Sequence, residues 1–150
     1  MSVGAEKFLD PGTDARYLEF ATKKNFQPDT LVLPSGTKAH WLGPKKTEKV
    51  IVWFHGECCL PTYLPCPNIG PIQTANHDTG GGYVMSCGLG HFAWFYNVTK
   101  SLAKSHSVSS IVLSYTCAPE GQYPTQLKQA AELLKHLIEV EGRKPSDVCG

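Results

Sequence analysis

Two apolar runs, each followed by a helical pattern, constrain the fold of this chain more than any other feature. Residues 50–54 (VIVWF) and 109–116 (SSIVLSYT) are rich in β-favouring residues, which is typical of strands buried on both faces of a sheet. Helical patterns follow at residues 91–106 and 124–142. This order of strand, helix, strand and helix predicts an α/β fold with a mostly parallel sheet and helices on both faces.

The two predicted helices have apolar residues at roughly helical spacing. In the first helix these are Phe92, Phe95, Tyr96, Leu102 and Ala103. In the second they are Leu127, Ala131, Leu134, Leu137 and Ile138. Pro124 suits the first turn of the second helix, and Gly142 suits its end.

Residues 30–34 and 38–43 are shorter strand-like pieces joined by Ser35-Gly36, which predicts a β-hairpin. Residues 1–25 are expected to form a helical or irregular lead-in. Residues 26–150 are expected to form a partial α/β domain, interrupted by an irregular insert at about residues 57–80. Nothing in the sequence predicts the oligomeric state.

The charge and the N-terminal sequence limit the partners of this chain. Its 150 residues carry a formal net charge of +1 and no basic run, so nucleic acid is not an expected partner. The start lacks the apolar core of a signal peptide, and no apolar run could span a bilayer. A cytoplasmic location is therefore the default expectation, and membrane anchoring of a longer form stays open.

Six cysteines raise the question of a metal site. Cys58, Cys59 and Cys66 lie close together with His77 nearby, and thiolates with imidazole are usual zinc ligands. However, no C-x-x-C pair and no second paired half accompany them. We therefore expect no metal and no cofactor. The remaining three cysteines, which are scattered along the chain, are expected to be small buried apolar residues: Cys87, Cys117 and Cys149.

Residues 57–79 are unlike their surroundings. They show no period of 2 or 3.6, are rich in Pro and Cys, and contain only two charged residues, Glu57 and Asp78. One interpretation is a long active-site loop, although structureless loops of this length are uncommon in compact domains. The other is a translated, retained intron. The codons of residues 56–57, 75–76 and 79–80 can contain an intron donor, a branch point and an acceptor, in this order and in one compatible reading phase. Removing the interval between donor and acceptor gives the sequence VIVWFHGGGYVMS.

The joined sequence HGGGY would carry chemistry. A glycine run lets backbone N–H groups approach a ligand closely. In acyl transfer such amides stabilise the oxyanion of the tetrahedral intermediate, and an HGGG element does so in lipases and esterases. A second motif, SYTCAPEGQYP at residues 114–124, follows the next strand and precedes a long helix.

With these two motifs in this order, the chain resembles the hormone-sensitive-lipase-like esterases, the alpha/beta-hydrolase fold-3 family. That family has a strand, HGGG, a helix, a strand, Y-x-x-A-P-E-x-x-x-P and another helix before its nucleophile elbow. The first motif matches at His55, Gly56, Gly81, Gly82 and Tyr83. The second matches at Tyr115, Ala118, Pro119, Glu120 and Pro124.

The resemblance implies specific roles for the first motif. The amides of Gly81 and Gly82, with Gly56, would form an oxyanion hole for a small-molecule ester or lipid substrate. His55 would shape that loop through hydrogen bonds, and Tyr83 would line a pocket or pack. Glu120 and the rest of the second motif would be structural.

The chain departs from the family at the nucleophile. No G-x-S-x-G occurs, and the sequence reaches RKPSDVCG where the strand before G-D-S-A-G is expected. We therefore expect an alpha/beta-hydrolase fold truncated before the nucleophile elbow, without Ser, Asp or His of a triad, and inactive by itself. A second unspliced intron beginning at residues 148–149 would explain this end.

Two alternatives to an esterase remain open: a ligand-binding member without catalysis, and a non-functional splice or gene-model fragment. The other histidines do not support a different catalytic site. His91, His106 and His136 lie on or beside predicted helices without an acidic partner at meaningful spacing, and we expect surface or capping roles for them.

Overall fold

The computed structural model describes residues 10–55 and 86–150. After an N-terminal helix, their elements follow the predicted order of a hairpin and then alternating strands and helices. In chain order they are α2 (Gly12–Lys24), β1 (Thr30–Val32), β2 (Lys38–Leu42), β3 (Lys49–Trp53), α3 (Leu89–Leu102), β4 (Val108–Ser114), α4 (Thr125–Lys135), a π-helical continuation of α4 (His136–Val140), a 3₁₀ turn (Pro145–Asp147) and β5 (Val148–Cys149).

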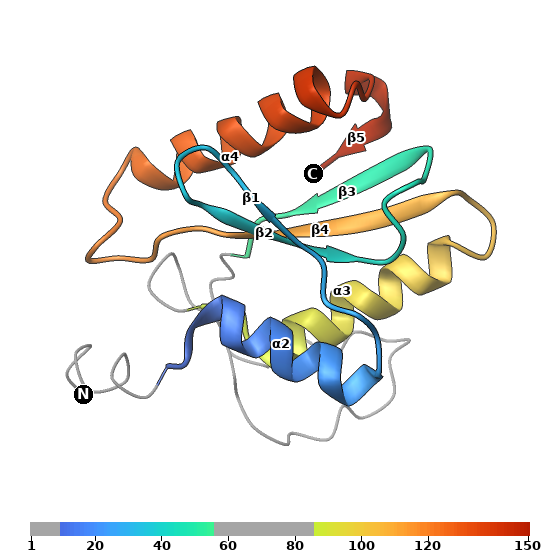
Figure 1. The fold of residues 1–150 in the computed structure, drawn as a ribbon, viewed down its shortest axis with the longest axis horizontal. Helices are drawn as coiled ribbons and strands as arrows, with labels where there is room; N and C mark the ends of the chain where they lie inside the picture. Colours follow the sequence, from blue (N-terminus) through green and yellow to red (C-terminus); the bar gives the residue numbers. More distant parts are fainter. Residues whose placement is uncertain (1–9, 56–85) are drawn as a thin grey trace, which may run out of the picture.

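The strands form one mixed sheet in the order β1-β2-β4-β3-β5 (Figure 1). Strand β3 lies between β4 and β5 and is parallel to both. The predicted hairpin is confirmed: β1 and β2 are antiparallel, and Gly36 in their turn has φ +86°, which favours glycine. Since β2 is also antiparallel to β4, the hairpin adds an antiparallel part to the parallel sheet.

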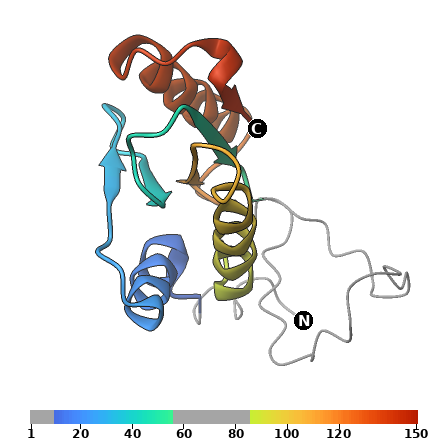
Figure 2. The same cartoon turned by 90° about the vertical axis from the view of Figure 1, so that its right-hand side faces the viewer.

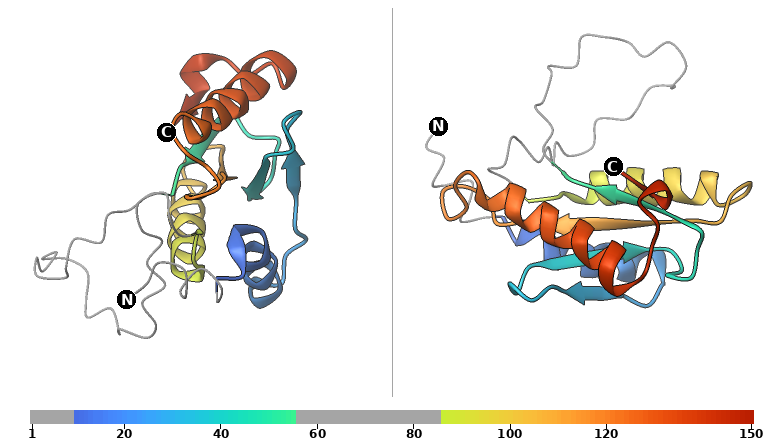
Figure 3. Two further views of the ribbon diagram at one scale, coloured as in Figure 1. Left: turned by 90° about the vertical axis from the view of Figure 1, so that its left-hand side faces the viewer. Right: turned by 90° about the horizontal axis from the view of Figure 1, so that it is seen from above.

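Helices cover both faces of the sheet, which confirms the predicted α/β class. Helix α4 lies on one face, and α2 and α3 lie on the other (Figure 2; Figure 3). Alternation along β2 sends Ala39 and Trp41 into the core beneath α4, whereas Leu42 joins the core beneath α2 and α3. The sheet therefore separates two hydrophobic cores.

Helix α2 belongs to the second of these cores. It ends at Asn25, which adopts the left-handed conformation (φ 54°) and bonds back to the last turn. Its buried Tyr17 and Phe20 pack with Phe92 of α3. The predicted boundary between residues 1–25 and 26–150 stays a prediction. None of the helices in the described part of the chain is long and apolar enough to cross a membrane.

The predicted apolar stripe of α4 is confirmed only in part. Leu137 is fully buried and Leu134 packs against the core, as predicted. Leu127 is 60% exposed and Ala131 is also exposed, whereas Leu133, which the predicted stripe did not include, is fully buried against the sheet. Apolar residues occur on more than one side of this helix, so its spacing alone does not select the buried face. Gly142, with φ +70°, follows the helical region as predicted.

Further burial predictions need correction. Cys149 is exposed and Cys117 is half-buried, whereas Cys87 is buried as predicted. Strand β3 is fully buried on only one face in the described structure, because Val50 and Val52 are buried while Ile51 and Trp53 on the opposite face are half-buried. Trp53 packs against Trp94 and Phe95 of α3. Phe54, just beyond the strand, is exposed. Leu102, expected in the stripe of α3, is partly exposed because the helix ends there.

Candidate functional site

The two motifs meet at one edge of the sheet. His55 follows β3 and Tyr115 follows β4, and the carboxyl ends of these parallel strands lie side by side. The Tyr115 hydroxyl donates a hydrogen bond to the backbone carbonyl of His55. Their rings stack with centroids 4.2 Å apart and an interplanar angle of 14°. Both side chains are buried, so Tyr115 holds the backbone at the end of β3.

The start of α2 contacts His55 from the other side. Thr13 is buried, and its Oγ1 lies 3.5 Å from His55 Nε2. The same Oγ1 accepts a 3.0 Å hydrogen bond from the backbone N–H of Cys87. Thr13 therefore contacts both described ends of the chain that flank residues 56–85.

Asp10 reinforces this connection. Its Oδ2 accepts a 3.0 Å hydrogen bond from the Ser86 backbone N–H, and its Oδ1 accepts a 2.6 Å bond from the Ser86 hydroxyl. Oδ1 also accepts the Gly12 backbone N–H at 3.0 Å. This carboxylate fixes the chain just before α3 relative to the start of α2.

The local electrostatics favour a neutral His55. Burial, together with the charge of His91, lowers the pKa of His55 to about 4, although the carboxylate of Asp10 acts in the opposite direction. The ring is therefore uncharged at neutral pH. Burial also raises the pKa of Cys87 far above its usual value. This thiol consequently stays protonated and is not an activated nucleophile.

The pKa of Asp10 responds to two opposing influences. Burial raises it, while hydrogen bonds from Ser86 and Gly12 and the charge of Arg16 lower it. The lowering outweighs the effect of burial. Asp10 is therefore ionised at neutral pH and serves as an acceptor for the Ser86 and Gly12 donors.

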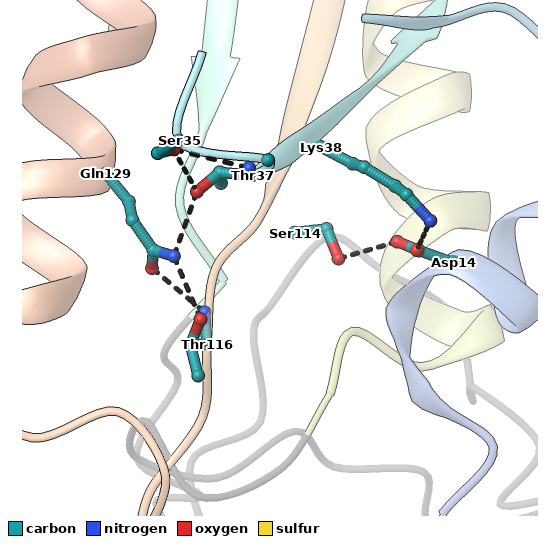
Figure 4. Close-up of a pocket in the computed structure, with 8 residues that line it drawn as sticks. Asp14, Ser35, Thr37, Lys38, Ser114, Thr116 and Gln129 are labelled. Atoms are coloured by element: carbon teal, nitrogen blue, oxygen red, sulfur yellow. Dashed lines mark hydrogen bonds and ion pairs between the residues drawn. The ribbon is translucent and has the colours of Figure 1, made fainter. Parts of the chain in front are cut away.

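A polar concavity of about 330 Å³ lies beside the end of β4 (Figure 4). On one side Gln129 of α4 donates 2.9 Å hydrogen bonds to the hydroxyls of Thr37 and Thr116. On the other side Asp14 accepts 2.7 Å hydrogen bonds from Ser114 and Lys38. The hydrogen bonds between these residues link α2, the hairpin and α4 around the end of β4.

A second concavity of about 330 Å³ adjoins the first and shares Asp14 and Ser114 with it. Its lining includes Asp10, Thr13, Ser86 and Tyr115. In open α/β sheets, ligands bind at the carboxyl ends of the strands. The second concavity, bordered by residues around His55, therefore lies where an open α/β sheet binds its ligand.

Asp14 also pairs with a buried histidine. Its Oδ1 lies 2.9 Å from Nε2 of His40, whose side chain is 2% exposed. The hydrogen bond from His40, together with those from Lys38 and Ser114, lowers the pKa of Asp14 far below its usual value despite partial burial. Thr30 Oγ1 lies 3.0 Å from His40 Nδ1 and completes this network.

The second motif forms a compact turn before α4. Gly121 is buried, and a Cβ placed there would lie 2.2 Å from the carbonyl oxygen of Thr116, so only glycine fits. The Gln126 amide donates to the carbonyls of Thr116 (3.0 Å) and Gly121 (2.7 Å). The Ala118–Pro119 and Tyr123–Pro124 peptides are cis, and Pro124 lies just before the first residue of α4.

Several solved structures with a similar fold are esterases. An esterase from the bacterial hormone-sensitive lipase family is 19% identical with a TM-score of 0.55, over 90% of this chain and 38% of its own. An esterase/lipase from an uncultured bacterium is 16% identical with a TM-score of 0.51, over 93% and 40%. Carboxyl esterase 2 from the mycorrhizal fungus Tuber melanosporum is 19% identical with a TM-score of 0.51, over 81% and 33%.

The chain has the alpha/beta-hydrolase fold. It spans about two fifths or less of the length of these esterases. No family model matches the sequence, and no curated protein does. At these identities the likeness establishes the hydrolase fold alone.

Several predicted residues lie outside the described part of the hydrolase fold. These are the proposed oxyanion-hole glycines and Tyr83 of the first motif, and the cysteines and histidine weighed as zinc ligands: Gly56, Gly81, Gly82, Tyr83, Cys58, Cys59, Cys66 and His77. Their assignments stay predictions. Within residues 10–55 and 86–150, no group of three or more His, Cys, Asp or Glu residues could hold a metal ion.

Among the remaining histidines of the described structure, His91 lies close enough to His55 for its charge to lower the pKa of that ring. His91 is half-buried on α3 near Phe95, and His106 is exposed after the end of that helix. His136 is half-buried where α4 continues as a π-helix. Their surface or capping roles stay predictions.

The roles of Asp10, Thr13 and Ser86 were not predicted from the sequence. A weak signal was present in the stretch Asp-Pro-Gly-Thr at residues 10–13, which combines turn residues with a good helix-start residue. Gly121 and Gln126 were also missed. Neighbouring residues do not predict the roles of Gly121 and Gln126, because both roles depend on the Thr116 carbonyl, which the turn brings close to them.

Proposed function

We propose that this chain is the oxyanion-stabilising portion of a serine ester hydrolase. The observation that carries the proposal is the meeting of His55 and Tyr115 at the carboxyl edge of β3 and β4. These residues belong to the two motifs that resemble the hormone-sensitive-lipase-like esterases. The fold is that of esterases, and the site lies where an open α/β sheet binds its ligand.

In this reaction a serine hydroxyl attacks the ester carbonyl, a histidine accepts the serine proton, and an aspartate orients the histidine. The amides of Gly81 and Gly82, with Gly56, would stabilise the negative oxygen of the tetrahedral intermediate. The substrate class is a small carboxylic ester or a lipid ester. Because residues 1–150 contain no G-x-S-x-G, we propose that they do not hydrolyse esters by themselves.

The retained-intron hypothesis belongs to this proposal, because HGGGY is continuous only when residues 57–79 are removed. Sequencing the transcript from before the codon of His55 to well past that of Gly150 tests it. We expect the main message to read HGGGY and to continue into G-D-S-A-G. A main message that keeps the insert and does not continue into G-D-S-A-G would overturn the esterase proposal for this gene.

Purified 150-residue chain provides the complementary test. A p-nitrophenyl ester assay should show no turnover above the buffer rate, because the nucleophile is absent. Turnover that survives further purification would contradict the proposed inactivity. Thermal unfolding with the same esters distinguishes the ligand-binding alternative, since a ligand that binds only the folded chain raises its melting temperature.

A further inference from the structure

The Thr13 hydroxyl contacts two groups, the backbone N–H of Cys87 and Nε2 of His55. Whether it can hydrogen-bond to both depends on where the hydrogens of Thr13 and His55 lie. Its Oγ1 accepts the Cys87 N–H at 3.0 Å and lies 3.5 Å from His55 Nε2. These are its two hydrogen-bond contacts in the described part of the chain. Both Thr13 and His55 are buried, so water does not replace a missing partner.

The orientation of the Thr13 hydroxyl decides the tautomer of His55. If Nε2–H donates to Thr13 Oγ1, the Thr13 hydroxyl hydrogen and the bare Nδ1 are both left without a partner among the described residues. If the Thr13 hydroxyl donates to a bare Nε2, only Nδ1–H is left without a described partner. The second arrangement leaves fewer buried polar groups unsatisfied and therefore has the lower free energy.

We propose that Thr13 is a positioning residue that fixes His55 as the Nδ1–H tautomer and so makes it a hydrogen-bond donor at the carboxyl end of β3. The Cys87 N–H occupies a Thr13 lone pair and turns the hydroxyl hydrogen toward Nε2. Asp10, through Ser86, fixes the chain from which Cys87 donates.

The chemical consequence rests on the proposed function. A neutral ring with hydrogen at Nδ1 attracts an oxygen acceptor, such as a carbonyl or an oxyanion, whereas a bare Nδ1 repels it. His55 is neutral because its burial disfavours the charged form. The tautomer chosen by Thr13 therefore leaves a buried donor beside the proposed site of negative charge.

The tautomer can be measured directly in the 150-residue chain by ¹⁵N NMR of its labelled histidines at neutral pH. In the unmodified chain, we expect the Nδ1 shift of His55 in the protonated range and the Nε2 shift in the unprotonated range. Thr13→Val removes the hydroxyl and should lower the Nδ1–H to Nε2–H ratio about fivefold or more, because about one hydrogen bond is lost. Thr13→Ser keeps the hydroxyl and should retain the original tautomer.

Thr99→Val is the matched control. Thr99 is as buried as Thr13, and its hydroxyl bonds to the Phe95 carbonyl and to Ser110, away from His55. It should cost comparable stability and leave the His55 shifts unchanged. If Thr13→Val does not fold, Thr13→Ser and the unmodified chain still decide the question.

An Nε2–H tautomer in the unmodified chain would overturn the proposal, and so would an unchanged ratio in folded Thr13→Val. Neither result bears on ester hydrolysis. Conversely, a transcript without HGGGY would overturn the proposed function and leave the tautomer result intact. The two failures are therefore distinguishable.

Discussion

The two faces of the sheet are built differently. Beneath α4, the core consists of apolar side chains, among them Trp41, Ile111 and Leu133. Beneath α2 and α3, aromatic rings share the interior with buried polar groups, among them His40 and Ser110. On the first face the hydrogen bonds join α4 to the hairpin, through Gln129 and Glu132, outside an apolar core. On the second face buried polar groups lie within the interior itself.

This difference shows which face positions the candidate site. A buried polar group is costly unless it has a partner. On the α2–α3 face the helices supply those partners: Asp14 for His40, and Thr99 for Ser110. The same arrangement continues to the end of β3, where Thr13 meets His55. Changes on the α4 face should therefore alter stability alone, whereas changes on the α2–α3 face should also alter protonation.

The largest effect is expected on the apolar face. Leu133→Ala removes a fully buried side chain and should lower the free energy of unfolding by about 2–5 kcal/mol. Leu127→Ala on the same helix is the matched control, because Leu127 is 60% exposed, and it should cost less than about 0.5 kcal/mol. Urea unfolding measures both. Equal losses would mean that the buried side of α4 is misassigned.

The second-largest effect is expected in the pH dependence of stability, to which the α2–α3 face contributes and the α4 face does not. The pKa of His55 falls from 6.5 to about 4 on folding, so the unfolded chain binds more protons between these values. Stability from this residue is complete above about pH 6.5 and is lost as the pH falls toward 4, by about 3 kcal/mol. His55→Asn should remove this slope.

Leu133→Ala provides the contrast for that measurement. It should lower the unfolding free energy by the same amount across pH 4–7, because no titrating group is touched. Urea unfolding at several pH values records both curves. A slope that persists in His55→Asn would exclude His55 as its source.

A smaller loss is expected from Asp14→Ala. It leaves buried His40 without its acceptor and should cost about 1–3 kcal/mol at neutral pH. Because folding lowers the pKa of Asp14, its contribution is present above the unfolded value of about 3.9 and is lost as the pH falls below it. The variant should therefore approach the unmodified chain in stability at strongly acidic pH.

Glu19→Ala is the control for this variant. Glu19 pairs with Lys23 on the exposed side of α2, so its removal should change stability by less than about 1 kcal/mol. Thermal or urea unfolding of both variants gives the comparison. If the two variants cost the same, the Asp14–His40 pair contributes no more than a surface ion pair.

The smallest effect is expected from Gln129→Ala. Its amide joins α4 to Thr37 and Thr116 near the surface, so losing these bonds should cost about 0.5–1.5 kcal/mol. Lys128→Ala, at the neighbouring exposed position, should stay within about 0.5 kcal/mol of the unmodified chain. Urea unfolding distinguishes the two variants by their midpoint concentrations, provided that both transitions have the same dependence on urea concentration. A larger loss for Lys128→Ala would contradict the bridging role of Gln129.

Local patterns were enough to predict much of the fold. The hairpin turn at Ser35-Gly36, the strand and helix order, and the helix end near Gly142 all follow from neighbouring residues, because turn conformation and periodicity are properties of short segments. The sequence also placed His55 and Tyr115 after successive strands. Since those strands are parallel, the two residues were bound to share an edge.

Tertiary structure alone decided the rest. The buried side of α4 depends on the sheet that it meets, so spacing could not choose between Leu127 and Leu133. The contact of Thr13 with His55 joins residues 42 positions apart, and the bond of Ser114 to Asp14 joins residues 100 positions apart. A polar side chain does not specify its partner locally, because satisfaction of its hydrogen bonds is settled only when distant elements pack together.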